Sequence, residues 1–365
     1  MVIAVLILLL IALSIILFLR HAPFGRPPSA ARLQYVKRSP HYRNGKFQNR
    51  SFTPQLTEGY SMRKIFFEWF FSRPPQLAPA QPLPSIKTDL LQLDPSTNLL
   101  VWFGHSSYFM QLHGTRFLVD PVLSGGASPV RGMIRAFPGS NNYTVDDLPS
   151  IDYLLITHDH YDHLDYDTMI QLKKKTGRVI CGLGVGAHLE HWGYDPAIIL
   201  EMDWDETETL APGIHLHTTT ARHFSGRSFS RNNTLWLSYV LETPGHKIFV
   251  GGDSGYDHHF KMIGERFGPF DLAIIENGQY NEAWKYIHTT PAEALQAATE
   301  LKAKRMMPVH SSKFALGKHP WNEPLIKITE LNRSFNVQLV TPLIGEAVFL
   351  DNETQQFTQW WTGLR

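Results

Sequence analysis

Cysteine is almost absent from this sequence. The chain of 365 residues contains one cysteine, Cys181, and therefore cannot form a disulfide bond within itself. This excludes the small secreted folds that depend on several disulfides, but it does not by itself assign a compartment. Since 43% of the residues are hydrophobic and 12% are aromatic, there is enough apolar chain for one large core or two smaller ones.

An excess of charge of either sign is also missing. The 34 Lys and Arg residues are balanced by 33 Asp and Glu residues, which gives a formal net charge of +1. Proteins that bind nucleic acid usually carry a basic excess, so we expect no nucleic-acid partner. The sequence also contains no internal repeat and no low-complexity array.

Long hydrophobic runs are absent except at the N-terminus. Residues 1–19 contain a single polar side chain, Ser14, and are about as long as a membrane-crossing helix. No basic residue precedes the run and no clear cleavage site follows it, so residues 1–20 are predicted to be an uncleaved transmembrane anchor rather than a signal peptide. Basic residues follow the run from Arg20 onward, which favours a single-pass membrane protein with a cytoplasmic body, at the inner membrane in a bacterium.

Residues 21–95 are rich in proline and in basic side chains and show little periodicity. We expect them to form a tether that wraps on the main domain and not a fold of their own. Within them, residues 61–71 form an aromatic segment with Arg63 and Lys64 near its start. Two interpretations are open for this segment: it lies in a membrane interface, or it covers an apolar edge of the main domain.

From Asn98 the pattern changes to short apolar runs separated by turns and helical segments. Strands are expected at residues 99–103, 108–112, 116–119, 151–155, 178–181, 214–220, 235–241, 247–250, 271–275 and 306–309. Helices are expected at residues 165–175, 257–267 and 291–301, with Asp165 as a cap and Pro291 in a first turn. Strands and then helices, twice over, predict an α/β (α+β) main domain over residues 96–351, with a two-sheet core and outer helices. Residues 352–365 are left as a C-terminal tail.

The strand at residues 151–155 leads into a loop with the sequence Thr-His-Asp-His-Tyr-Asp-His. Imidazoles and carboxylates this close together are unfavourable away from water unless something binds them. Nitrogen and carboxylate oxygen are ligands that Zn²⁺ accepts, so the loop predicts a metal site. The candidate ligands are His158, His160, Asp162 and His163. The alternative is a solvated loop that is rich in histidine by chance.

Three more polar residues, His223, Asp253 and His310, stand just after predicted strands. Loops at strand ends carry functional side chains on a rigid scaffold, and the glycines around Asp253 allow a close backbone approach. Taken alone, each is an ordinary loop residue. In order after the histidine-rich loop, they complete a recognisable set of metal ligands.

This ordered set resembles the metallo-β-lactamase fold superfamily and, within it, the N-acylphosphatidylethanolamine-hydrolysing phospholipase D family. The resemblance covers residues 98–350 and rests on several further motifs. These are Trp102-Phe103-Gly104-His105, Val119-Asp120-Pro121, Ala127-Ser128-Pro129, residues 158–165, Gly252-Asp253-Ser254-Gly255-Tyr256, residues 266–273, and the run from His310 to Leu316. It implies a metallo-β-lactamase αββα sandwich with two Zn²⁺ ions per chain in a groove at its edge.

The resemblance also assigns the ligands to the two ions. His158, His160 and His223 are implied to hold one ion, Asp162, His163 and His310 the other, and Asp253 is implied to bridge them. His288 matches a further active-site histidine of the family. The N-terminal hydrophobic run and the lipid-contacting loops are where this chain departs from the family pattern.

The implied function is a membrane-anchored, zinc-dependent phosphodiesterase that cleaves a phospholipid to phosphatidic acid and an N-acylethanolamine. Two ions about 3.5 to 4 Å apart can share a hydroxide, which would attack phosphorus, and both ions would stabilise charge on the phosphoryl oxygens. Asp253 and His288 are the predicted catalytic residues, with His288 polarising the phosphate or protonating the departing alkoxide. The alternative for His288 is simple packing on Trp284. Asp120 is expected to accept a hydrogen bond from a ligand histidine, or else to cap a turn before Pro121.

Two other functions stay open. A lactonase or a small-molecule phosphodiesterase of the same fold would use the same metal centre, because fold does not fix substrate. A non-enzymatic, membrane-tethered metal-binding protein would keep its cellular role without its metal.

The expected partners are a phospholipid or other phosphodiester substrate and the membrane, and a homodimer is also considered. Tyr256, Tyr280 and Trp284 are candidates to line a lipid groove, and the role of His105, near the predicted site, is left open.

Overall fold

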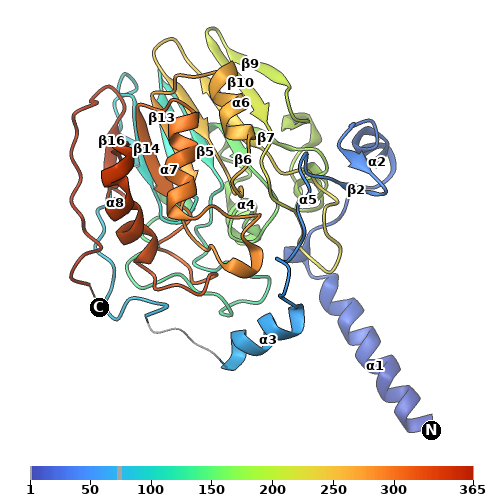
Figure 1. The fold of residues 1–365 in the computed structure, drawn as a ribbon. Helices are drawn as coiled ribbons and strands as arrows, with labels where there is room; N and C mark the ends of the chain where they lie inside the picture. The colour runs from blue at the N-terminus through green and yellow to red at the C-terminus, as the bar shows by residue number, and fades with distance from the viewer. Residues whose placement is uncertain (1, 72–75, 365) are drawn as a thin grey trace.

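The computed structural model describes residues 2–71 and 76–364. At its centre two seven-stranded sheets pack face to face, and helices cover both outer surfaces (Figure 1). This arrangement confirms the predicted two-sheet core with outer helices. The long apolar helix at the N-terminus projects away from the sandwich.

The first sheet combines antiparallel and parallel strands. In order across the sheet, it contains β16 (Ala347–Phe349), β3 (Leu99–Trp102), β4 (Tyr108–Leu112), β5 (Thr115–Val119), β6 (Ile151–Ile156), β7 (Thr176–Gly182) and β8 (Ile199–Met202). The strands from β16 to β5 pair antiparallel, and those from β5 to β8 pair parallel. The helices α4 (Tyr166–Leu172) and α5 (Gly186–His191) belong to the connections between the parallel strands.

The second sheet repeats this plan. In order across the sheet, it contains β15 (Gln338–Leu339), β14 (Arg305–Val309), β13 (Leu272–Glu276), β12 (Lys247–Val250), β11 (Ser238–Glu242), β10 (Ile214–Thr219) and β9 (Thr207–Ala211). Its parallel half, β12 to β15, is connected through α6 (His259–Arg266), α7 (Pro291–Glu300) and α8 (Glu323–Phe335). Thr290 and Glu293 form a capping box at the start of α7, with Pro291 at its first position.

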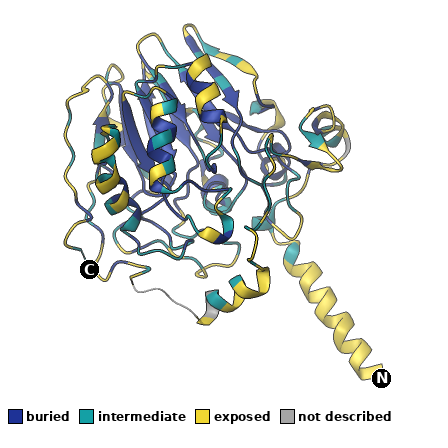
Figure 2. Cartoon of the chain, in the orientation of Figure 1, coloured by how far each residue is buried: buried dark blue, intermediate teal, exposed yellow. Residues whose placement is uncertain are grey.

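Alternating side chains divide the interior into three apolar layers. Along β12, Ile248 and Val250 face the first sheet, whereas Phe249 packs beneath the helices of the second sheet. Along β6, Leu155 faces the second sheet, whereas Leu154 packs with the residues of α4 and α5. Both faces of each sheet are therefore buried, which explains why these strands read as nearly continuous apolar runs (Figure 2).

Residues 22–71, which we call the N-terminal wrap, lie along one side of the sandwich. They contain α2 (Ala30–Val36), a small hairpin of β1 (Tyr42–Arg43) and β2 (Lys46–Phe47), and α3 (Met62–Phe71). Val36 and Phe47 are fully buried in the layer between the sheets, and Arg32 forms ion pairs with Glu190 and Glu201. The α1 helix (Val2–Leu19) precedes the wrap, contains no buried residue and is exposed along most of its length (Figure 2). Short 3-10 helices span Ala22–Phe24, Leu90–Gln92, Val145–Asp147, Pro196–Ile198 and Glu282–Trp284.

Some predicted boundaries are wrong, for identifiable reasons. The strand expected at residues 235–241 begins only at Ser238, because Leu235 and Leu237 donate their amides to Leu183 and Thr157, in loops of the first sheet. The helix expected to reach residue 175 ends at Leu172, beyond which the Lys175 ammonium donates to backbone carbonyls instead. The elements β8, β9, β15, β16, α2, α5 and α8 were not predicted.

Candidate metal centre

The candidate ligands converge at one edge of the sandwich. His158, His160, Asp162 and His163 follow β6, His223 follows β10, Asp253 follows β12, and His310 follows β14. The strands β12, β13 and β14 are parallel, and β10 points the same way because β11 lies antiparallel between it and β12. Their carboxyl ends therefore meet at one edge, and the structure brings all seven predicted ligands together there.

Three imidazoles form the first group. His160 Nδ1 lies 2.9 Å from His158 Nε2 and 3.2 Å from His223 Nε2. Burial lowers the pKa of His160 to about 4 and those of His158 and His223 well below the usual histidine value, so all three are neutral at pH 7. Nitrogens bound to one tetrahedral zinc, each about 2.0–2.1 Å from the ion, lie about 3.3 Å apart. The three lone pairs are therefore spaced as ligands of one ion.

Carboxylates dominate the second group. His310 Nε2 lies 3.3 Å from Asp162 Oδ2 and 3.2 Å from Asp253 Oδ2, and His163 Nε2 lies 3.2 Å from Asp253 Oδ1. Asp253 Oδ2 is also 3.8 Å from both His158 and His223, so its carboxylate lies between the two groups. Burial alone would lower the pKa of His310, but Asp253, Asp162 and Glu276 raise it to about 10. This excess of negative charge is what a bound cation would neutralise.

Buried polar atoms without partners test whether the group fits a metal. His163 Nε2 and Asp253 Oδ1 are buried 3.2 Å apart, and neither makes a hydrogen bond to a described residue. Such atoms cost free energy unless something binds them. Nitrogen and carboxylate donors converge in three overlapping clusters, each within 4.8 Å, and match the ligands of divalent transition metals. The residues present therefore fit the binding of metal at this edge.

Neighbouring groups orient most of the candidate ligands. Asp120 Oδ2 accepts a hydrogen bond from His163 Nδ1 at 2.8 Å, as predicted from the sequence, and Asp120 also accepts from the amide and hydroxyl of Thr157. The Nδ1 of His223 donates to the Ile287 carbonyl at 2.9 Å. These bonds leave Nε2 of each imidazole facing the centre, which is how metal-binding histidines are usually held.

His288 lies beside the candidate ligands, on the loop before α7. Its ring centroid is 5.2 Å from that of His223 and 5.1 Å from that of His310. Its Nδ1 donates to Glu276 Oε2 at 2.6 Å, so Nε2 is the nitrogen available to a ligand in the pocket. The interpretation of His288 as a residue that only packs on Trp284 does not account for this bond.

Glu276 is a residue that the sequence analysis missed. It ends β13, is 1% exposed, and also lies 3.1 Å from His310 Nδ1. Its carboxylate accepts hydrogen bonds from the amides of Ser254 and Thr289. The sequence does contain a signal for Glu276, because this carboxylate follows the apolar run Leu272–Ile275 just as Asp253 follows β12.

His105, which was left open, lies in the turn after β3 at the same edge. It is fully buried, and its Nε2 lies 2.9 Å from Asp162 Oδ2. It also falls within the cluster formed by Asp162, His163 and His310. Burial lowers the pKa of His105 to about 3, so this imidazole is neutral and donates a hydrogen bond to the carboxylate.

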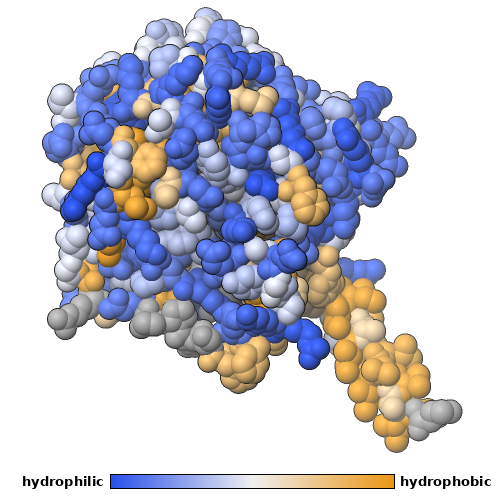
Figure 3. Space-filling view, in the orientation of Figure 1, coloured by the Kyte–Doolittle hydropathy of each residue, from blue (hydrophilic) through white to orange (hydrophobic). Residues whose placement is uncertain are grey.

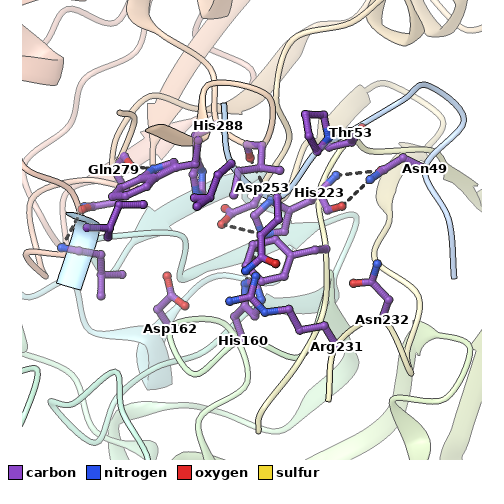
Figure 4. Close-up of a pocket in the computed structure, with 18 of the residues that line it drawn as sticks. Asn49, Thr53, His160, Asp162, His223, Arg231, Asn232, Asp253, Gln279 and His288 are labelled. Atoms are coloured by element: carbon purple, nitrogen blue, oxygen red, sulfur yellow. Dashed lines mark hydrogen bonds and ion pairs between the residues drawn. The ribbon is translucent and has the colours of Figure 1, made fainter. Parts of the chain in front are cut away.

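A cavity of about 450 Å³ opens beside the candidate ligands (Figure 4). One part of its wall is polar and includes Lys46, Asn49, Arg231 and Asn232. The other part is apolar and includes Leu56, Met62, Ile65, Trp284, Ile287 and Leu316. Tyr256 and Tyr280, which were expected to line a groove, instead donate their hydroxyls to Glu300 and Glu323.

The wrap supplies much of this wall. Asn49 accepts the His223 amide at 3.1 Å and donates to the His223 carbonyl at 2.7 Å, so the wrap fixes the backbone of a candidate ligand (Figure 4). The proline-rich sequence of this segment contains no periodic signal that predicts these contacts.

Comparisons with known proteins agree with this geometry. A family model for a beta-lactamase superfamily domain matches residues 115–311. An uncharacterized protein of Mycobacterium tuberculosis is 37% identical over 338 residues, which cover 90% of each chain. The N-acyl-phosphatidylethanolamine-hydrolyzing phospholipase D 1 of Caenorhabditis elegans is 30% identical over 318 residues, which cover 79% of this chain and 87% of that protein.

Solved structures share the fold. Igni18, a novel metallo hydrolase of Ignicoccus hospitalis, aligns with a TM-score of 0.53 at 20% identity, over 69% of this chain and 97% of that chain. With the clustered histidine and aspartate side chains, these matches show that the chain belongs to the metallo-β-lactamase superfamily, as a metal-dependent hydrolase in the family that includes the N-acyl-phosphatidylethanolamine-hydrolysing phospholipases D.

Proposed function

We propose that this protein is a zinc-dependent phosphodiesterase that hydrolyses an N-acylated phosphatidylethanolamine to phosphatidic acid and an N-acylethanolamine. The observation that carries the proposal is a two-part ligand cluster with Asp253 between its halves, open to a pocket that is partly apolar. Two zinc ions in such a site would lower the pKa of a water and stabilise charge on phosphoryl oxygens. The ligand groups for them would be His158, His160 and His223, then Asp162, His163 and His310, with Asp253 shared.

The remaining chemistry falls to residues of the chain. Hydrolysis forms a bond from a water oxygen to phosphorus and breaks the bond from phosphorus to the ethanolamine oxygen, which then needs a proton. His288 is suited to supply that proton from Nε2, because Glu276 holds its Nδ1 and fixes the direction of the ring.

The pocket wall supports an amphiphilic substrate. Leu56, Met62, Ile65 and Leu316 give one part of the wall an aliphatic surface, whereas the metal ligands and Asn49 make the other part polar. A lipid fits this division, because its phosphoryl group takes the polar part and its acyl chain the apolar part. A small, fully polar diester leaves the apolar wall uncovered.

Two apolar helices support action at a membrane. The α1 helix has a mean hydropathy of 3.5 over 18 residues, which is about 27 Å of helix and long enough for a hydrocarbon core. The α3 helix contributes the exposed side chains Met62, Phe67 and Phe71. Figure 3 shows the apolar surfaces of α1 and α3 on the same side of the body. We place α1 in the inner membrane of a bacterial cell with the catalytic domain cytoplasmic, and α3 in the adjoining interface.

One experiment tests the chemistry. The purified protein is analysed for bound metal and assayed on N-acylated phosphatidylethanolamine, phosphatidylcholine and a chromogenic diester in ¹⁸O-labelled water. We expect two zinc ions per chain and ¹⁸O in the phosphatidic acid, since water attacks phosphorus. Label in a released fatty acid, or turnover of the chromogenic diester alone, would reject the proposed reaction.

A further inference from the structure

Arg231 is a half-buried cation that faces the pocket without a counter-charge. It lines the cavity together with His160 and Asp253, and Figure 4 shows its side chain extending into that cavity. No carboxylate of the described residues lies within 4 Å of its guanidinium, and burial lowers the pKa of Arg231. A guanidinium shielded from water without an anion is in an unfavourable state, which an anionic ligand would relieve.

The immediate contacts of Arg231 fix its direction without neutralising it. Its guanidinium carbon lies 4.8 Å from the centroid of the Phe224 ring, which stacks against one face. Gln55 of the wrap, with its amide oxygen turned inward, accepts from Nη1 at 2.7 Å and from Nη2 at 3.2 Å. A guanidinium has five N–H donors, so these contacts leave donors free on the pocket side.

Two other shielded arginines of the described chain use their guanidinium groups for contacts within the fold. Arg227 donates to the carbonyl oxygens of Pro23, Asp159 and Leu164, and Arg32 is paired with two glutamates. Arg231 thus differs from residues that use a guanidinium to hold the fold together. Lys46 lines the same part of the pocket and adds a second positive charge there.

We propose that Arg231 is the residue that binds the anionic head group of the substrate. This inference rests on the proposed function and deepens it: the pocket takes an anionic amphiphile, whose phosphoryl oxygens contact Arg231. The acyl chain then runs along Met62, Ile65 and Leu316. The fork of the guanidinium matches two oxygens of one phosphoryl group, which a lysine cannot reproduce. The product phosphatidic acid carries more charge than the substrate, so Arg231 also makes it a product inhibitor.

Binding of a product analogue tests the inference without turnover. Zinc-loaded full-length protein in detergent is titrated calorimetrically with dihexanoyl phosphatidic acid and, in parallel, with uncharged dihexanoylglycerol. We expect Arg231→Gln to weaken binding of the phosphatidic acid by about 10- to 100-fold and to leave binding of the glycerol lipid unchanged, because a charge-assisted bond is lost. Arg231→Lys should recover part of the loss, since it keeps the charge but not the fork.

Arg50→Gln is the matched control, since Arg50 lies on the wrap outside the pocket and pairs with Asp205. Unchanged phosphatidic acid affinity in Arg231→Gln at full zinc content overturns the inference, as does an equal loss for the uncharged lipid. If Arg231→Gln does not fold, Arg231→Lys decides, and wild-type affinity there counts against the inference. Arg231-dependent binding without any phospholipid hydrolysis would reject the proposed reaction and keep this inference. Phospholipid hydrolysis by Arg231→Gln with an unchanged KM would support the proposed reaction and reject the inference about Arg231.

Discussion

The loops that carry the candidate metal ligands and the N-terminal wrap build one site in different ways. The ligand loops leave strands whose carboxyl ends are buried, and buried groups such as Asp120 and Glu276 hold their side chains. The wrap contributes no strand to the two seven-stranded sheets and reaches the site through Asn49 and Gln55. The comparison teaches that the metal centre belongs to the core of the fold, whereas a large part of the substrate-facing wall is added from outside it.

The largest effect is expected where the two ligand groups meet. Asp253→Ala removes the carboxylate between them, so we expect fewer than two zinc ions per chain and a loss of activity above about 100-fold, more than the loss of an outer partner causes. Metal analysis and kcat/KM measure both. The melting temperature of this variant should also respond less to added zinc than that of the wild type. If Asp253→Ala kept its full zinc content and wild-type activity, Asp253 would not be a metal ligand.

The next effect separates chemistry from metal binding. His288→Asn should lower kcat by about 10²- to 10⁴-fold, because a positioned proton donor is lost, while both metal ions stay bound. Steady-state kinetics and metal analysis of the same sample test this. His217→Asn is the control. His217 lies on β10, away from the pocket, and is hydrogen-bonded to Thr207 and Glu242 on the neighbouring strands. A normal kcat in His288→Asn would mean that another group donates the proton.

A smaller effect is expected one shell away from the metal ligands. Asp120→Asn keeps the size of the side chain that accepts from His163 but removes its charge. Zinc affinity should fall by about 10- to 100-fold, as for other outer partners of metal-binding histidines. Competition with a coloured chelator measures this affinity. An unchanged affinity would show that the fold alone orients His163.

The wrap should affect substrate use more than metal content. Asn49→Ala leaves the His223 amide and carbonyl without their partner, so we expect a loss of about 1–3 kcal/mol in the free energy of unfolding. The KM for a lipid substrate should rise while the zinc content stays at two ions. Chemical denaturation and lipid kinetics check these outcomes, with Gln48→Ala, an exposed neighbour on the wrap, as the control. Loss of zinc in Asn49→Ala would show that the wrap, like the core of the fold, is needed to hold the metal.

The smallest effect on chemistry should come from the anchor. Removal of residues 1–20 should lower activity on lipid vesicles by about tenfold, because a tether raises the effective concentration of substrate at the bilayer. Activity on a soluble diester should not change. Equal losses on both substrates would instead assign residues 1–20 to folding.

The sequence was most informative where one physical rule decides the structure. The strands β4 and β12 were predicted at their exact bounds, because turns punctuate runs that are buried on both faces. The candidate ligands were found because polar residues directly after buried strands gather at one edge. The same rule, applied to residues 272–276, would have found Glu276.

Other features depend on contacts between distant parts of the chain. Residues 235–237 are apolar and buried like a strand, but their amides pair with loops of the other sheet. The contacts of Asn49 with His223 and of Gln55 with Arg231 join residues far apart in the chain, so no local sequence pattern predicts them. Packing against the sandwich, not propensity, decides the path of the wrap.

The most direct test of the two-ion centre is diffraction from zinc-loaded crystals at the zinc absorption edge. The anomalous map should contain two peaks per chain. One is expected among His158, His160 and His223, the other among Asp162, His163 and His310, with the Asp253 carboxylate between them. A single peak, or peaks away from these side chains, would contradict the account.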